Sequence, residues 1–159
     1  MIIEYKKDDI PKILNVINDA AMKYRGIIPD KCLTEPYMSE KELLLEFSRD
    51  FRMFGYRKNN ILVGVMGIQK IKNVTLIRHA YTLTSHQRKG IGKSLLRYIL
   101  DINKDDRLLV GTWRRAKWAI RFYEKFGFIL HKKKQTVYLL EKYWNISLKQ
   151  IENSVVLEK

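Results

Sequence analysis

The segment SHQRKGIGKSLL, residues 85 to 96, joins a strand-like run to a helix-like run and holds the residues most suited to chemistry. Glycines at positions 90 and 92 lie among several cations. Such a turn can aim several free backbone N–H groups at one point, where the helix dipole adds positive potential. Glycine also allows a bulky anion to approach closely. The segment therefore predicts an anion site, and a plain glycine loop before a helix is the competing interpretation.

Two familiar phosphate-binding motifs do not fit this segment. A Walker A loop requires G-x-x-x-x-G-K-[ST], and the position of its first glycine is occupied by Gln87. A dinucleotide fingerprint requires G-x-G-x-x-G, and the position of its third glycine is occupied by Leu95. The local pattern thus predicts an anion without saying which one.

The charge balance also indicates an anionic partner. The 159 residues include 31 Lys and Arg against 17 Asp and Glu, a formal net charge of +14. Such a balance favours either nucleic acid or a phosphate-rich cofactor. Basic residues also gather in RRAK, residues 114 to 117, and in HKKK, residues 131 to 134, where a solvated surface is the simpler explanation.

Composition restricts the class of protein. A hydrophobic fraction of 46% over residues 1–159 predicts a single domain with a real core. The only cysteine is Cys32, so no disulfide forms within the chain and no cysteine metal cluster exists; a reducing, cytoplasmic setting fits. We also expect no metal site, no signal peptide and no membrane-spanning segment.

The elements that must position the turn follow from hydrophobic periodicity and turn residues. We expect a mixed α/β layer fold, an α+β mixed sheet with the order β-α-α-β-β-β-α-β-α-β. A capping box of Ser39 and Glu42 begins the second helix. Strands are predicted at residues 2–5, 51–58, 61–70, 74–84, 107–113 and 128–130, and helices at 11–23, 40–49, 91–102 and 119–126. A C-terminal helix at 135–144 and a strand at 153–159 complete either the sheet or a dimer contact.

Two motifs in this arrangement match one family. QRKGIG, residues 87 to 92, fits Q/R-x-x-G-x-G/A between a central strand and a helix. AIRFYEKFGF, residues 119 to 128, fits A-x-x-[LF]-Y-x-K-x-G-F at the helix after the next strand. Over roughly residues 1 to 131 the chain resembles the GCN5-related N-acetyltransferases (GNAT).

The resemblance implies the GNAT-like acyl-CoA N-acyltransferase fold and acetyl-CoA as cofactor. It implies that the turn binds the pyrophosphate, and that the pantetheine arm lies along the central strand. In the family the tyrosine of the second motif stabilises the leaving thiolate, and that residue is Tyr123. The implied cofactor-binding residues are Ala80, Tyr81, Thr82, Leu83, Gln87, Arg88, Lys89, Gly90, Ile91, Gly92 and Lys93.

Two positions depart from the family pattern and leave the general base open. Ala116 stands where the family often has a pantetheine-contacting Asn, and Leu76 stands where some members carry a catalytic Glu. His79 is the only base-like residue on the central strand, so it is our candidate base, with a core histidine as the alternative.

Acceptor choice in the family depends on the first two helices and their loop. Acidic and aromatic groups there can receive a cationic amine, although ordinary loop residues would look the same. The candidate acceptor-binding residues are Tyr24, Asp30, Glu35 and Tyr37.

The resulting hypothesis is an acetyl-CoA-dependent N-acetyltransferase that moves an acetyl group directly to a primary amine in a ternary complex. One alternative is a basic nucleic-acid-binding domain in which Trp113 and Trp118 stack bases. Another is an acyl-CoA-binding module without catalysis. The amine, a small molecule or a peptide, is not specified by the sequence. A homodimer is compatible with the sequence.

Overall fold

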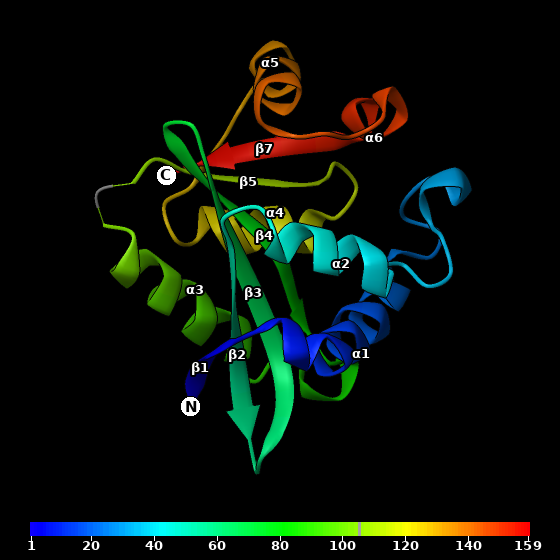
Figure 1. Cartoon of the computed structure of the whole chain (residues 1–159). Helices are drawn as coiled ribbons and strands as arrows, with labels where there is room; N and C mark the ends of the chain where they lie inside the picture. The colour runs from blue at the N-terminus through cyan, green and yellow to red at the C-terminus, as the bar shows by residue number, and fades with distance from the viewer. Residues whose placement is uncertain (105) are drawn as a thin grey trace.

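A seven-stranded mixed sheet forms the centre of the protein (Figure 1). The computed structural model describes residues 1–104 and 106–159. Strand order is β1-β2-β3-β4-β5-β7-β6, and neighbours are antiparallel except for the parallel pair β4 and β5. The strands are β1 Ile2–Tyr5, β2 Phe51–Lys58, β3 Ile61–Ile71, β4 Val74–Thr82, β5 Leu108–Trp113, β6 Ile129–Leu130 and β7 Ser154–Glu158. The predicted mixed α/β architecture is confirmed.

Helices cover both faces of this sheet. On one face, α1 and α2 form a core cluster with β1, β2 and β3, while α5 packs on β4, β5 and β7. On the other face, α3 and α4 pack over the middle strands. The helices are α1 Ile10–Ala21, α2 Glu40–Phe47, α3 Ile91–Ile102, α4 Lys117–Glu124, α5 Lys133–Tyr143 and α6 Leu148–Glu152. No helix among the described residues is long and apolar enough to cross a membrane.

Local signals in the sequence correspond closely to the observed starts of elements. The Ser39 hydroxyl accepts from the Glu42 N–H while the Glu42 carboxylate accepts from the Ser39 N–H, so the predicted capping box is confirmed. Asn59 and Asn60 both have positive φ, 49° and 64°, as a two-residue hairpin turn requires. The capping box and the hairpin turn depend only on residues close together in the sequence, which is why the sequence predicts both.

Several predicted element ends were too late. The helix α1 ends at Ala21 and passes into a 3-10 turn at Met22–Tyr24, α2 ends at Phe47, and β4 ends at Thr82. The last difference has a tertiary cause. The Thr84 N–H and hydroxyl both donate to the Asp19 carboxylate of α1, which draws the chain into a 3-10 turn directly after β4. The short helix α6 was not predicted.

The C-terminal segment completes the sheet. Strand β7 lies between β5 and β6 and pairs antiparallel with both, from Leu109↔Glu158 to Trp113↔Ser154 on one side. Val156 and Leu157 on β7 are fully buried. Of the two roles left open for the tail, the sheet role is therefore the one observed, and α5 covers this part of the sheet.

Candidate functional site

The strands β4 and β5 separate halfway along their length. Their parallel pairing covers only Thr75↔Leu108, Leu76↔Leu109 and Ile77↔Val110, whereas β4 continues to Thr82. On its other edge, β5 pairs with β7 from Leu109 to Trp113, and beyond this point β7 is its remaining partner. Figure 1 shows β5 and β7 crossing at a steep angle to β2 and β3. From residue 78 onward, β4 therefore has an open edge within the described pairings.

A β-bulge marks the start of this open edge. Along β3 and β4 the register passes from Gly67↔Arg78 to Val65↔Tyr81, so β4 contains one extra residue. His79 within the bulge has a φ of 54°, a conformation that L-residues rarely adopt. A Cβ at Gly67 would lie 2.5 Å from the Phe51 ring and 3.1 Å from the Arg78 carbonyl oxygen. Glycine at position 67 thus permits the close approach that the bulge requires.

Backbone groups after the bulge alternate between β3 and the open edge. The Leu83 N–H donates to the Val63 carbonyl at 2.9 Å, so this amide is committed to the sheet. In an antiparallel pair the hydrogen-bonding direction alternates along the strand, so Tyr81 faces β3 as Leu83 does, while Thr82 between them faces the open edge, where its carbonyl accepts from Gln87. The Leu83 N–H is therefore not free at the open edge, and cofactor binding by Ala80 to Leu83 stays a prediction.

The turn after β4 presents a row of backbone N–H groups at the start of α3. Within the described residues, no protein acceptor bonds the amides of residues 88 to 93, and the first bond at the start of α3 is from the Ser94 N–H to the Gly90 carbonyl. Gly90 has a φ of 79° and Arg88 a φ of 60°, and a Cβ at Gly90 would have open space around it. This arrangement can receive an anion at a helix N-terminus.

Side chains of the same segment fix the shape of the turn. The Gln87 amide donates to the Thr82 carbonyl at 3.3 Å, and the Lys89 ammonium donates to the Ser85 carbonyl at 2.9 Å. Gln87 therefore holds the turn against β4. The start of α3 also lies close to β3, because a Cβ at Gly64 would come within 2.5 Å of the buried Ile91 side chain. Arg88 and Lys93 remain exposed beside the free amides.

Tyr123 is buried on α4, in the cluster that also contains the start of α3. It is 4% exposed, and its ring lies 5.1 Å from Phe122 and 5.4 Å from Phe128. Burial, with a smaller contribution from the nearby Tyr24, raises the pKa of the Tyr123 phenol. The hydroxyl therefore stays protonated at neutral pH and can act as a hydrogen-bond donor.

Aromatic rings from distant segments meet where β4 and β5 separate. We call Tyr24, Tyr37, Tyr81, Trp113 and Trp118 the aromatic cluster. Tyr24 is central to it, with ring centroids between 5.6 and 6.4 Å from the other four. The Trp113 Nε1–H donates to the Tyr37 hydroxyl at 3.2 Å. The structure thus brings together the two predicted tyrosines, Tyr24 and Tyr37.

The aromatic cluster is uncharged but attracts a cation. Burial raises the pKa of the Tyr24, Tyr37 and Tyr81 phenols, so all three stay neutral at physiological pH. The Lys23 ammonium lies 4.4 Å from the Trp118 ring centroid, a cation–π distance. The ring faces of this cluster are therefore suited to an ammonium group.

The two acidic residues predicted beside these tyrosines lie elsewhere on the loop. Asp30 begins an exposed 3-10 turn, and the exposed Glu35 forms an ion pair with Arg25 at 2.8 Å. In the structure, the loop brings its aromatic side chains to the sheet and leaves these carboxylates in solvent.

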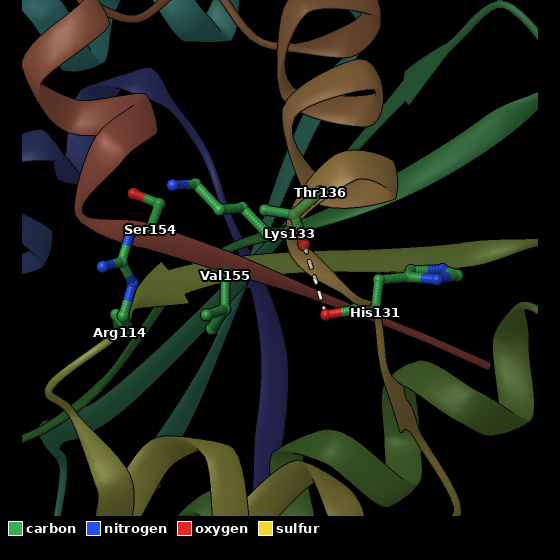
Figure 2. A pocket seen from close by; sticks show the side chains of 6 residues that line it. All are labelled: Arg114, His131, Lys133, Thr136, Ser154 and Val155. Carbon is green, nitrogen blue, oxygen red and sulfur yellow. Dashed lines mark hydrogen bonds between the residues drawn. The ribbon is translucent and has the colours of Figure 1, made fainter.

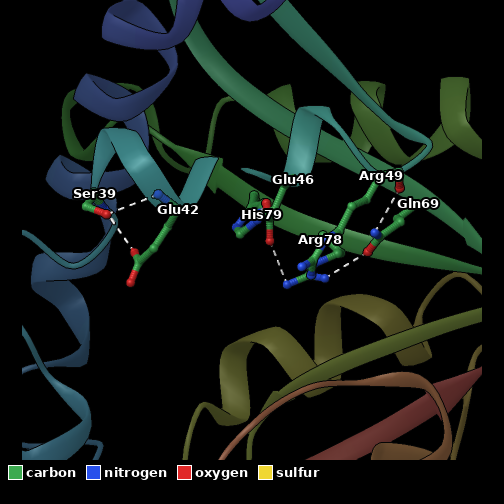
Figure 3. A network of polar contacts seen from close by, with 7 residues as sticks. All are labelled: Ser39, Glu42, Glu46, Arg49, Gln69, Arg78 and His79. Atoms are coloured by element: carbon green, nitrogen blue, oxygen red, sulfur yellow. Dashed lines mark hydrogen bonds and ion pairs between the residues drawn. The ribbon is translucent and has the colours of Figure 1, made fainter. Parts of the chain in front are cut away.

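His79 belongs to a polar network between α2 and the bulge (Figure 3). Its Nε2 contacts the Glu46 carboxylate, which also accepts from Arg78 at 2.7 Å. His79 is thus a largely buried side chain with an acidic partner. Sequence reasoning missed Glu46 and Arg78, because Glu46 is 33 residues from His79 and no local pattern links them.

A separate cavity of about 220 Å³ lies between β7, the start of α5 and the end of β5 (Figure 2). Its polar walls are already paired: the Thr136 hydroxyl donates to the His131 carbonyl, and the Ser154 hydroxyl donates to the Gln150 carbonyl. None of the predicted site residues lines this cavity. The open edge of β4 and the aromatic cluster are therefore the better candidate site.

A family model described as an acetyltransferase (GNAT) domain matches residues 49–130. The chain therefore belongs to the GNAT acetyltransferase family. The match includes the β4 bulge, the turn at residues 84 to 93 and all of α4, so it covers the open edge and the amide row.

Solved structures of other acetyltransferases share the fold of this GNAT chain. The PaiA N-acetyltransferase of Thermoplasma acidophilum, solved in complex with coenzyme A, is 21% identical, with a TM-score of 0.75 over 100% of this chain and 97% of that one. A GNAT-family acetyltransferase of Staphylococcus aureus Mu50 is 16% identical, with a TM-score of 0.74 over 100% and 97% of the two chains. At these identities the likeness concerns the fold alone.

A relative with higher identity is much longer. The UPF0157 protein YqkA of Bacillus subtilis is 33% identical over 94 residues, which are 58% of this GNAT chain and 27% of YqkA. The chain thus matches about a quarter of the length of that protein.

Proposed function

We propose that this GNAT chain transfers an acetyl group from acetyl-CoA directly to a primary amine within a ternary complex. The proposal depends on one observation: the open edge of β4 leads directly into the row of free amides at residues 88 to 93. An extended acyl arm ending in a diphosphate needs both features side by side.

The residues present fit such a ligand. The amides of residues 88 to 93 would bind the pyrophosphate, and Gly90 leaves room for it. Arg88, Lys89 and Lys93 would add positive charge around the phosphates. Bound acetyl-CoA would supply an activated thioester. The outward-facing backbone groups of Ala80 and Thr82 would hold its arm, in the way that a neighbouring strand would be held.

Backbone N–H groups near the bulge would stabilise negative charge that develops on the thioester oxygen. A fixed amide donor aimed at a developing oxyanion is worth roughly 10²- to 10³-fold in rate. The open edge of β4 begins at the bulge, so the Ala80 amide is the proposed donor.

The acceptor amine must lose a proton before it attacks. A lysine-like amine has a pKa near 10.4, so only about one in 2,500 molecules is neutral at pH 7. We assign His79 as the general base. Its Nε2 faces the Glu46 carboxylate and therefore carries the hydrogen of the neutral ring, which leaves Nδ1 as the basic nitrogen.

Tyr123 is proposed to stabilise the leaving thiolate. A phenol has a pKa near 10 and a thiol a pKa near 8.5, so full proton donation is uphill. Burial raises the phenol pKa further. A hydrogen bond from the Tyr123 hydroxyl to the developing thiolate is therefore the role that its environment favours.

The aromatic cluster is the proposed entry for the acceptor amine. Tyr24 and Tyr37 would contact the ammonium before it reaches the base, as Trp118 now contacts Lys23. Asp30 and Glu35, exposed on the same loop, would attract a cation from solution at longer range.

A thiol-release assay with acetyl-CoA and a panel of primary amines, paired with thermal shift, tests the proposal. We expect acetyl-CoA to raise the melting temperature and at least one amine to release CoA. Stabilisation by CoA without release for any amine would support the non-catalytic module. Retention on heparin that is lost at moderate salt, without CoA binding, would support the nucleic-acid-binding alternative.

A further inference from the structure

Glu46, near the end of α2, contacts both residues at the start of the β4 bulge (Figure 3). One carboxylate oxygen accepts from Arg78 Nη2 at 2.7 Å, and the other contacts His79 Nε2. The three side chains are largely buried, with 15% of Glu46, 26% of Arg78 and 10% of His79 exposed. A single carboxylate thus links α2 to two consecutive residues of the central strand.

The network closes through β3. Arg78 Nη1 donates to the Gln69 Oε1 at 2.8 Å, and the Gln69 Nε2 donates to the Arg49 carbonyl at 3.0 Å, just beyond α2. Gln69 is 4% exposed, so these are buried hydrogen bonds without competition from water. The end of α2 is therefore held at two points on the sheet.

Apolar packing alone anchors α2 weakly. The helix has eight residues, of which Leu43 is the one buried residue, while Leu44 and Leu45 are about half exposed. A helix of this length depends on tertiary contacts for its stability. The polar network therefore supplies an anchor at the end of α2 that lies over the bulge.

The bulge itself needs support. A non-glycine residue at positive φ is strained and persists where the surroundings enforce it. His79 has a φ of 54°, and Glu46 holds its ring while Gln69 and Glu46 hold Arg78 beside it. The position of the bulge decides which backbone groups of β4 face the open edge.

We propose that Glu46 is a positioning residue for acetyl transfer, which fixes the tautomer and ring orientation of His79 and holds the bulge in register. This inference rests on the proposed function. Glu46 acts through His79 and through the backbone after it, without contacting the acetyl group.

The charge state of Glu46 agrees with this role. Burial alone would raise the pKa of its carboxyl, but the hydrogen bond from His79 and the charges of Arg78 and Arg49 outweigh burial and lower the pKa. The group is consequently an anion at neutral pH. Its contribution to stability is complete above the ordinary pKa of Glu, about 4.3, and is lost as pH falls through the lowered value.

The test compares Glu46→Gln with Glu42→Gln in steady-state CoA release. Both changes remove one charge from α2, but Glu42→Gln keeps the capping box and lies away from β4. We expect Glu46→Gln to lower kcat about 10- to 100-fold with the CoA dissociation constant unchanged within twofold, and Glu42→Gln to leave both unchanged. Glu46→Asp, which retains the charge, should recover part of kcat and serves as the test if the Gln variant does not fold.

A double-mutant cycle with His79→Asn separates positioning from simple loss of stability. Asn tolerates positive φ, so the backbone at position 79 is kept. If Glu46 acts largely through His79, the two losses of kcat are far from additive in the double variant, and any remaining loss measures the effect of Glu46 on the bulge. Additive effects, or full activity of Glu46→Gln, would overturn the inference while an active wild type leaves the proposed function standing. A wild type that releases no CoA with any amine would overturn both.

Discussion

The two ends of the open edge of β4 are built in different ways. We call residues 82 to 93 the donor end, because they would bind acetyl-CoA, the acetyl donor. This end is one continuous segment whose backbone N–H groups and local side-chain bonds form the turn. We call the bulge, Glu46 and the aromatic cluster the acceptor end, because they would receive the amine. The side chains of this end come from six separate segments: the turn after α1, the loop that follows this turn, α2, β4, β5 and α4.

This difference has a consequence for specificity. The donor end would recognise its ligand mainly through backbone groups, which side-chain changes do not remove. The acceptor end would recognise its ligand through ring faces and one histidine, so single substitutions there change what binds. We therefore expect variants at the two ends to affect different kinetic constants.

The largest expected effect on turnover comes from Tyr123→Phe. Tyr123 is the residue proposed to donate a hydrogen bond to the leaving thiolate, between the donor end and the acceptor end. Loss of one hydrogen-bond donor to the developing thiolate should lower kcat about 100-fold. The CoA dissociation constant should stay within twofold, because the ring and its packing remain. Rates of CoA release and binding titrations measure the two quantities.

Tyr98→Phe is the matched control for this variant. Tyr98 is a partly buried tyrosine on α3 that packs 5.2 Å from Phe54, away from the second motif. We expect it to leave kcat unchanged. Equal turnover of Tyr123→Phe and the wild type would remove Tyr123 from the mechanism and leave catalysis to the acceptor end alone.

The same contrast explains what could be predicted from the sequence. QRKGIG lies in one segment, so its spacing predicted a turn of free amides at a helix start, and the structure contains that turn. Glu46 reaches His79 only because α2 folds over the bulge, and an extra residue in β4 has no sequence signature here. Local chemistry is readable from sequence, whereas contacts made across the sheet are not.

The alternation of backbone groups along β4 gives a second example. The strand predicted at residues 74–84 is the central strand before QRKGIG, and β4 is indeed in the middle of the sheet. Which amides remain free depends on the register with β3, which the bulge changes. The Leu83 N–H, for example, is committed to β3, because it donates to the Val63 carbonyl.

Replacement of Gly90 by valine should act on the donor end alone. Gly90 has a φ of 79°, and the left-handed conformation costs a residue with a Cβ about 1–2 kcal/mol. If the turn shifts to relieve this strain, the amides no longer converge, and we expect the CoA dissociation constant to rise about tenfold. Isothermal titration with CoA measures this change.

Gly26→Val provides the control. Gly26 has a φ of 73° and also has open space around its Cα, so the variant introduces the same strain in the loop after α1. It should lower stability without changing CoA affinity. Unchanged CoA affinity in Gly90→Val would show that the diphosphate binds elsewhere.

Trp118→Leu should act on the acceptor end alone. The ring face that now attracts Lys23 is lost, and a cation–π contact at such a site is worth about 0.5–1 kcal/mol. The KM for a cationic amine should rise about threefold to fivefold, while CoA affinity stays the same. Initial rates at saturating acetyl-CoA, over a range of amine concentrations, measure the KM.

Trp144→Leu is the corresponding control, because Trp144 packs over Gly111 in the cluster around α5. It should change stability and leave the amine KM unaltered. A rise in KM for both tryptophan variants would mean that the acceptor does not depend on the aromatic cluster in particular.

Glu158→Gln should have the smallest effect on the enzyme. It should change the stability of the fold and leave the function of both the donor end and the acceptor end unaltered. Glu158 on β7 accepts from Arg107 and from His131 Nε2 at 2.7 Å. The hydrogen bond from Arg107 is the largest influence on the Glu158 carboxyl and lowers its pKa. Burial raises the pKa, but the hydrogen bond from His131 and the charges of Arg107 and His131 lower it further. Because the folded-state pKa is depressed, the ion pair stabilises the fold fully above the ordinary pKa of about 4.3 and ceases to do so as pH falls through the lowered value.

The variant should therefore lose about 1 kcal/mol of unfolding free energy at pH 7, since the pair is partly exposed, and the difference should vanish in acid. Urea titrations of both proteins at several pH values measure it, with the exposed Glu141→Gln as a neutral control. Turnover at pH 7 should be the same in all three proteins. If Glu158→Gln instead slows acetyl transfer, β7 contributes more to the open edge than its position beyond β5 suggests, and the division into donor and acceptor ends would have to include it.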